Sequence, residues 1–116
     1  MNPLDYSLCT QTVTVYRKQA DRILRQVVEN CYFRLEHQHK VEALGSRREK
    51  AFLLIVPGED PCVFAGDRVL EGIGPEIEME QWNRFIPALV DGLVEVSYTA
   101  PYCWEGSICH VEAGGR

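Results

Sequence analysis

Apolar and polar residues alternate with a period of two along much of this chain, which is typical of β-strands that bury one face. The clearest example is Cys31–Glu36, where Cys31, Phe33 and Leu35 fall on one face and the intervening residues fall on the other. Thr12–Tyr16 alternates β-branched residues without a breaker, which favours a second strand. Both segments predict an antiparallel sheet with one buried face and one solvent-exposed face.

The middle of the chain carries a continuous apolar run between turn signals. Phe52–Val56 has no polar alternation, so we expect a strand that is covered on both faces. Pro57-Gly58 and Gly66-Asp67 are turn pairs, because proline presets φ and glycine accepts a positive φ. A short strand, Arg68–Leu70, follows the second turn. Residues 22–28 fit either a helix or a strand, and their β-branched content favours a strand.

The last third of the chain returns to a period of two. Val94, Val96 and Tyr98 fall on one side of the expected strand. The elements predicted here are a strand at 93–98, a turn at 102–106, a last strand at 107–112 and a flexible tail at 113–116.

One segment, Glu76–Phe85, changes to helical spacing. Its apolar residues are three or four apart, acidic residues stand near its start, and Pro87 prevents its continuation. We therefore expect one short helix here, of about three turns at most. Residues 37–50 form the longest hydrophilic stretch, and we interpret them as a mobile hairpin loop between extended arms.

These elements predict a single domain over residues 1–116. It is mainly β, a small antiparallel barrel or sandwich of about six strands with one short helix. The chain shows no signal-peptide pattern at its start and no apolar run of transmembrane length, so we expect a cytoplasmic protein.

The net charge of −5 is unevenly distributed along the chain. Residues 1–50 hold nine Lys and Arg against six Asp and Glu, whereas residues 51–116 hold three against eleven. The two signs either fold into a mixed surface or form two oppositely charged faces that meet on neighbouring molecules. The overall acidic balance argues against specific nucleic-acid binding.

The candidate catalytic and metal-binding groups lack the spacing that such sites need. His37, His39, Cys103, Cys109 and His110 offer nitrogen and sulfur, but the chain has no C-x-x-C pair, and sequential residues of a strand point to opposite faces. A dyad of Cys103 with His110 would need an orienting group and an oxyanion hole, and the sequence shows no motif for either. We expect no catalytic residue, no metal and no cofactor. The odd number of cysteines, five, predicts free thiols in a reducing compartment.

Basic and aromatic residues are the candidates for a protein–protein interface. A basic cluster in a polar loop is commonly a solvated tip, and most aromatic residues are core, so only one or two are expected at a surface. The candidate interface residues are Arg47, Arg48, Lys50, Trp82, Phe85, Tyr102 and Trp104.

The order of these motifs resembles a family of small proteins of unassigned function that prophages and temperate phages of Gram-positive gut bacteria encode. The resemblance spans nearly the whole chain. It is carried by the segments at 12–16, 30–34, 45–47, 52–58, 65–75 and 110–115. In those genomes such proteins lie among head and tail structural genes, and the resemblance extends to head-closure and head–tail connector proteins.

The resemblance implies a non-enzymatic virion structural protein that joins the head to the tail or completes the head. Its partners would be copies of itself in a homo-oligomeric ring and neighbouring head or tail proteins, with no membrane and no specific nucleic acid. The alternatives are a small cytosolic β-barrel module that binds a peptide or small ligand, and a metal-dependent or thiol enzyme. A binding module is indicated by an exposed apolar groove near Trp82 and Trp104 without oligomerisation, and an enzyme by bound metal.

Overall fold

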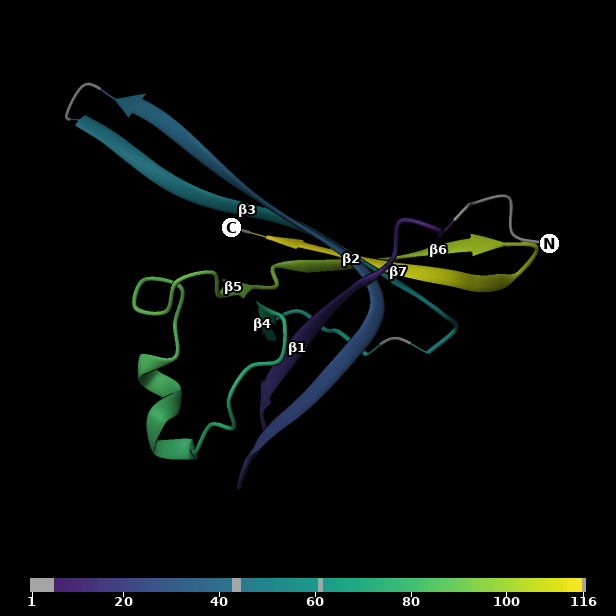
Figure 1. Ribbon diagram of the computed structural model, residues 1–116, viewed down its shortest axis with the longest axis horizontal. Helices are drawn as coiled ribbons and strands as arrows, with labels where there is room; N and C mark the ends of the chain where they lie inside the picture. Colours follow the sequence, from purple (N-terminus) through teal and green to yellow (C-terminus); the bar gives the residue numbers. More distant parts are fainter. Residues whose placement is uncertain (1–5, 43–44, 61, 116) are drawn as a thin grey trace.

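The computed structural model describes residues 6–42, 45–60 and 62–115, with the backbone alone described for residues 36–42 and 45–50. The chain forms seven antiparallel strands and one short helix (Figure 1). In chain order the elements are β1 (Gln11–Lys18), β2 (Ile23–Glu42), β3 (Gly45–Pro57), β4 (Arg68–Glu71), η1 (Met79–Arg84), β5 (Val94–Glu95), β6 (Tyr98–Trp104) and β7 (Ser107–Gly115). The mainly β prediction is confirmed.

The strands lie in the order β5-β4-β1-β2-β3-β7-β6, and the long strand β2 belongs to both halves of this sheet. Its first part, Ile23–Cys31, pairs with β1, and its second part, Tyr32–Glu42, pairs with β3. Near the end of the first part Asn30 takes a left-handed conformation with φ of 56°, which asparagine tolerates better than most residues. The change of partner at this point lets one strand turn from one half of the sheet into the other.

A second crossing joins the two edge strands. Val96 exchanges backbone hydrogen bonds with the β4 side, accepting from Gly66 and donating to Asp67, both at 2.8 Å. The next residue, Ser97, donates its N–H to the carbonyl of Gly114 on β7, also at 2.8 Å. β5 and β6 therefore stand at opposite ends of the strand order although only two residues separate them. The sheet is a folded, open sandwich and not a closed barrel.

The main core consists mostly of valine side chains, with two phenylalanines, and it draws on both halves of the sheet. Cys31 and Phe33 are buried and Leu35 packs against them, which confirms the face assigned from their alternation. The face assigned to Tyr98 is wrong, because its side chain is 54% exposed while Val94 and Val96 are buried. The crossing at Ser97 breaks the alternation. The buried members of this core are Val13, Val15, Val28, Cys31, Phe33, Phe52, Leu54, Val63, Val69, Val94, Val96 and Ala113.

Strand number and turn position differ from the sequence prediction near the C-terminus. The strand expected at 93–98 is divided by the crossing into β5 and the start of β6. β6 then continues through residues 102–104, which were expected to be a turn, whereas the segments expected at 22–28 and 31–36 form the one strand β2. The turn itself is confined to Glu105 and Gly106, both with positive φ, as a two-residue hairpin requires.

The prediction of a flexible tail at 113–116 is wrong for residues 113–115, the part that the structure describes. Ala113, Gly114 and Gly115 continue β7 and pair with Leu54, Leu53 and Phe52. Glycine is needed here, because a methyl group at Gly114 would collide with the Tyr98 ring and one at Gly115 with the carbonyl oxygen of Glu95. The glycines that suggested flexibility therefore permit close packing. Arg116 lies outside the described residues.

The expected helix at Glu76–Phe85 is present in shortened form. η1 is a six-residue 3₁₀ helix, and the Glu78 N–H donates to the Gln81 side chain at 2.9 Å just before it begins. It lies beside β4 and β5 at one side of the sheet (Figure 1). In the described chain we find no helix that is both long and apolar enough to cross a membrane.

Candidate protein–protein interface

A two-stranded ribbon extends from the sheet and is the most prominent feature of the molecule (Figure 1). The ribbon comprises Glu36–Glu42 of β2 and Gly45–Ala51 of β3, which pair with each other from Glu36↔Ala51 to Glu42↔Gly45. Among the described residues neither stretch pairs with a third strand. The long hydrophilic stretch is thus paired strand, and the predicted hairpin loop is much shorter than expected.

The basic interface candidates all lie in this ribbon. The register pairs Arg47 with Lys40, Arg48 with His39 and Lys50 with His37. Residues directly opposite in an antiparallel pair share a face. Positions 37, 39, 48 and 50 therefore share one face of the ribbon, and positions 40 and 47 share the other. Their side chains lie outside the described part of the structure, so the expectation about their mobility is not addressed.

Trp82 and Phe85, two of the aromatic candidates, are core residues and not surface contacts. Their side chains are 8% and 6% exposed, and they form a second buried cluster with Tyr16 and Leu93. The Tyr16 and Phe85 rings meet edge to face with centroids 4.7 Å apart. Their assignment to the interface is therefore wrong. Their helical spacing correctly indicated one shared face, and that face points inward.

Arg68 secures η1 to the sheet, and the sequence offered no signal for this role. Its guanidinium lies 3.7 Å from the centroid of the Trp82 ring, and Nη1 donates to the carbonyls of Trp82 and Phe85, each at 2.6 Å. Burial lowers the pKa of Arg68 from its ordinary value. The arginine satisfies the carbonyl groups at the end of η1.

Tyr102 and Trp104 lie on the β6–β7 hairpin. Tyr102 is half-buried and stacks on His110 with ring centroids 5.0 Å apart and an interplanar angle of 4°. Trp104 ends β6 at the hairpin turn and is 41% exposed. A partly exposed tryptophan is a typical anchor of protein interfaces. Of the four aromatic candidates, Trp104 is the one that remains on the surface.

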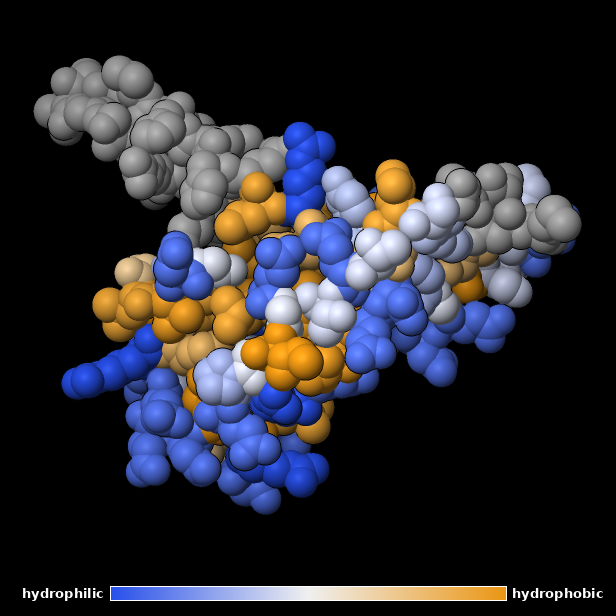
Figure 2. Space-filling model, in the orientation of Figure 1, coloured by the Kyte–Doolittle hydropathy of each residue, from blue (hydrophilic) through white to orange (hydrophobic). Residues whose placement is uncertain are grey.

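Other large apolar side chains are exposed at several separate places. Figure 2 shows hydrophobic surface over the loop that follows η1, where Leu89 is 67% exposed. The exposed large apolar residues are Leu8, Phe64, Ile73, Leu89, Tyr98 and Trp104.

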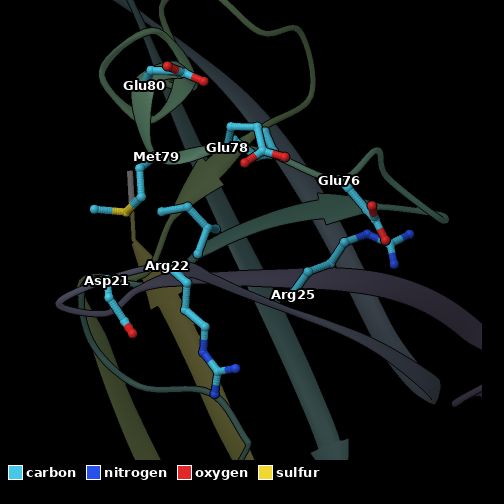
Figure 3. A pocket seen from close by; sticks show the side chains of 9 residues that line it. Asp21, Arg22, Arg25, Glu76, Glu78, Met79 and Glu80 are labelled. Atoms are coloured by element: carbon cyan, nitrogen blue, oxygen red, sulfur yellow. The ribbon is translucent and has the colours of Figure 1, made fainter.

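A hollow of about 570 Å³ brings together the two differently charged parts of the sequence (Figure 3). The β1–β2 turn and the start of β2 contribute Arg22 and Arg25, and the segment before η1 contributes Glu76 and Glu78. Arg25 is held by two hydrogen bonds to the carbonyl of Gly74. The structure therefore mixes the two signs at this place instead of separating them.

An ion pair between half-buried Arg17 and buried Asp67 connects β1 to the loop before β4. Arg17 Nε and Nη2 donate to the two carboxylate oxygens of Asp67 at 2.9 and 2.8 Å, and the Phe64 N–H donates to the same carboxylate at 2.9 Å. The Asp67 hydrogen bond raises the pKa of Arg17. Sequence reasoning placed Asp67 in a turn and missed this contact.

The sequence candidates for metal or thiol chemistry are dispersed. The register opposes Cys103 to Ile108 and His110 to Tyr102, and His110 is 3% exposed, with its Nδ1 2.7 Å from the Tyr6 hydroxyl. The side chains of His37 and His39 lie outside the described part. Within the described residues no three His, Cys, Asp or Glu side chains are grouped as metal ligands.

Comparison with known protein families, with curated proteins and with solved structures gave no match.

Proposed function

We propose that this protein is a non-enzymatic virion structural protein of a phage or prophage. It acts as a head–tail joining or head-completion subunit through ring-type contacts between copies and with neighbouring head or tail proteins. The observation that carries the proposal is the ribbon of β2 and β3, which continues beyond the third strand of the sheet. The resemblance of the sequence to phage structural proteins supports the same role.

The ribbon needs a partner on physical grounds. An isolated two-stranded hairpin is at best marginally stable in water, because it buries little apolar area and leaves both outer edges without backbone partners. Its described strands comprise Glu36–Glu42 and Gly45–Ala51, and the apolar positions in that part are few. Contact with a second molecule would supply the missing partner groups, as in other cases of strand and hairpin recognition.

The position of the ribbon suits assembly into a ring. The ribbon and the β6–β7 hairpin lie on opposite sides of the molecule (Figure 1). The hairpin carries exposed Trp104. A ring requires a heterologous contact, in which one surface of a subunit docks on a different surface of the next. The ribbon, with Arg47, Arg48 and Lys50, is the first surface in this proposal. The second is an acidic surface of the neighbouring subunit or head protein.

The test is capture of the products of adjacent head and tail genes by the purified protein. Replacing residues 37–50 with Asn-Gly should leave the folded sheet intact and abolish capture, because Asn-Gly favours a tight hairpin turn. Reversing Arg47 and Arg48 to Glu should weaken capture, whereas the matched reversal of exposed Arg84 to Glu should not. Circular dichroism and thermal unfolding verify the fold of each variant. Normal numbers of infectious tailed particles after deletion of the whole gene would refute the proposal.

A further inference from the structure

A cavity of about 370 Å³ lies between the N-terminal segment and the outer face of β2, β3 and β7. Its size falls within the range of small-molecule sites in proteins. Most of its lining is apolar or aromatic, and one imidazole and one carboxylate interrupt it. The lining residues are Tyr6, Leu8, Cys9, Tyr32, Ile55, His110 and Glu112.

His110 is held rigidly in the wall of this cavity. It is 3% exposed, its ring stacks on Tyr102, and the Tyr6 ring meets it edge-on with centroids 5.5 Å apart. Its Nδ1 lies 2.7 Å from the Tyr6 hydroxyl. These contacts fix the plane of the imidazole, and therefore the direction in which its second nitrogen points.

The second nitrogen, Nε2, is buried and has no hydrogen-bond partner among the described residues. The Glu112 carboxylate lies close to it, but its Oε1 is 3.7 Å away, too far for a hydrogen bond. A buried polar atom without a partner is costly and uncommon in folded proteins. Both His110 and Glu112 line the cavity, so a ligand there can supply the missing partner.

We propose that this cavity binds an aromatic alcohol, a phenol-type group, whose hydroxyl bridges His110 Nε2 and the Glu112 carboxylate. The bridge requires the tautomer in which the Tyr6 hydroxyl donates to Nδ1 and Nε2 carries the proton. In that tautomer the ligand oxygen accepts a hydrogen bond from Nε2–H and the ligand O–H donates to the Glu112 carboxylate. In the other tautomer the single hydroxyl proton could serve Nε2 or Glu112 but not both.

The lining selects against other ligand classes. A carboxylate would be repelled by Glu112, and an ammonium group has only donors and could not accept from Nε2–H. A purely apolar ligand would leave the buried nitrogen without a partner. The rings of Tyr6 and Tyr32, with Leu8 and Ile55, favour a planar aromatic body through stacking and edge contacts. This site does not depend on the proposed structural role, and either can fail alone.

The experiment is an NMR titration of the full chain with p-cresol and, as the matched probe without the hydroxyl, toluene. p-Cresol should bind with a dissociation constant on the order of 1 mM, as expected for a ligand of this size. Toluene should bind about tenfold more weakly, since it cannot satisfy Nε2. Amide shifts should concentrate at residues 6–9, 32, 55 and 108–112. Capped Gly-Tyr-Gly and Gly-Phe-Gly peptides form a second pair of probes, and binding of the tyrosine peptide would show that a protein side chain also fits.

Two variants separate the hydroxyl contact from simple occupation of an apolar cavity. His110→Phe keeps a ring for Tyr102 to stack on and should bind p-cresol no better than toluene. Glu112→Gln, at a half-exposed position, should retain the fold and weaken p-cresol several-fold, while Glu59→Gln, in an exposed loop, should bind as the unmodified protein does. Equal affinity for p-cresol and toluene, shifts outside the cavity, or unchanged p-cresol binding by folded Glu112→Gln would overturn the proposal.

Discussion

The Arg68 guanidinium lies 3.7 Å from the centroid of the Trp82 ring, and the same side chain donates to the carbonyls of Trp82 and Phe85. One side chain thus supplies a cation–π contact and satisfies two backbone groups at the end of η1. β4 and η1 are connected through Arg68 more directly than by any contact that the sequence indicated.

Replacing Arg68 with Ala should lower the free energy of unfolding by about 2–4 kcal/mol, because two partly buried carbonyls lose a charged donor and the Trp82 ring loses its cover. Arg68→Lys should retain part of this stability, since an ammonium group cannot reproduce the planar fork. Urea unfolding measures both. Exposed Arg84→Ala should change stability by less than about 0.5 kcal/mol. A loss of that small size for Arg68→Ala would contradict the role assigned to it.

Asp67 and Arg17 should behave as a coupled pair. Removing the charge with Asp67→Asn should cost about 2–3 kcal/mol, because Arg17 and the Phe64 N–H lose a buried acceptor. Arg17→Met should cost a similar amount. In the double variant the losses should be clearly less than additive, as a double-mutant cycle by urea unfolding would show. Additive losses would mean that the two groups act independently.

Gly115→Ala should destabilise the protein by about 2 kcal/mol or more. The new methyl group would collide with the Glu95 carbonyl and lie 2.8 Å from Ser97 Oγ, at the place where the chain crosses between the halves of the sheet. Thermal unfolding measures the effect, and exposed Ala100→Ser serves as the control. An unchanged melting temperature would show that the end of β7 is not packed as described.

Stability should fall between about pH 9 and pH 11 in part because of Cys31. Burial raises the pKa of this thiol from 9.0 to about 11 in the folded protein. In that window the unfolded chain loses the Cys31 proton while the folded protein retains it. The unfolded state then binds fewer protons, so stability decreases with rising pH. Urea unfolding at pH 8, 9, 10 and 11 measures the slope.

The matched variants for this pH dependence are Cys31→Ala and Cys103→Ala. Cys31→Ala should be less stable at pH 8 but show a smaller decrease toward pH 11. Exposed Cys103→Ala should leave the slope unchanged. If Cys31→Ala keeps the full slope, the decrease comes from other groups.

Several strands and their buried faces were predictable from the sequence, because strand geometry is local. Cys31 and Phe33 alternate with polar neighbours, and that alternation alone places both on the buried face. The β-branched residues of β1 and the apolar run of β3 also indicated strands, but through residue type and flanking turn residues and not through alternation with polar neighbours. The helical spacing before Pro87 likewise indicated η1, although packing shortened it to six residues.

Tertiary structure decided the features that depend on distant contacts. The alternation from Val94 predicted that Tyr98 would lie on the same side as Val94 and Val96, but at Ser97, which donates to the Gly114 carbonyl, the chain crosses to the other half of the sheet. Gly115 lies in a glycine-rich segment that suggested a tail, yet it pairs with Phe52 as a strand residue, and glycine is needed there because the Glu95 carbonyl lies close to it. The local sequence pattern does not indicate such close contacts between residues that are distant in the sequence.

For the candidate interface too, some features were predictable from the sequence and others depended on tertiary contacts. The sequence by itself determined where basic residues occur, and it drew attention to Arg47, Arg48 and Trp104. Only the paired register showed that the basic segment is a ribbon without a third strand, and only packing buried Trp82 and Phe85. Side-chain type and local periodicity are properties of neighbouring residues. Exposure and unsatisfied groups, such as His110 Nε2, arise from segments up to about a hundred residues apart that the fold brings together.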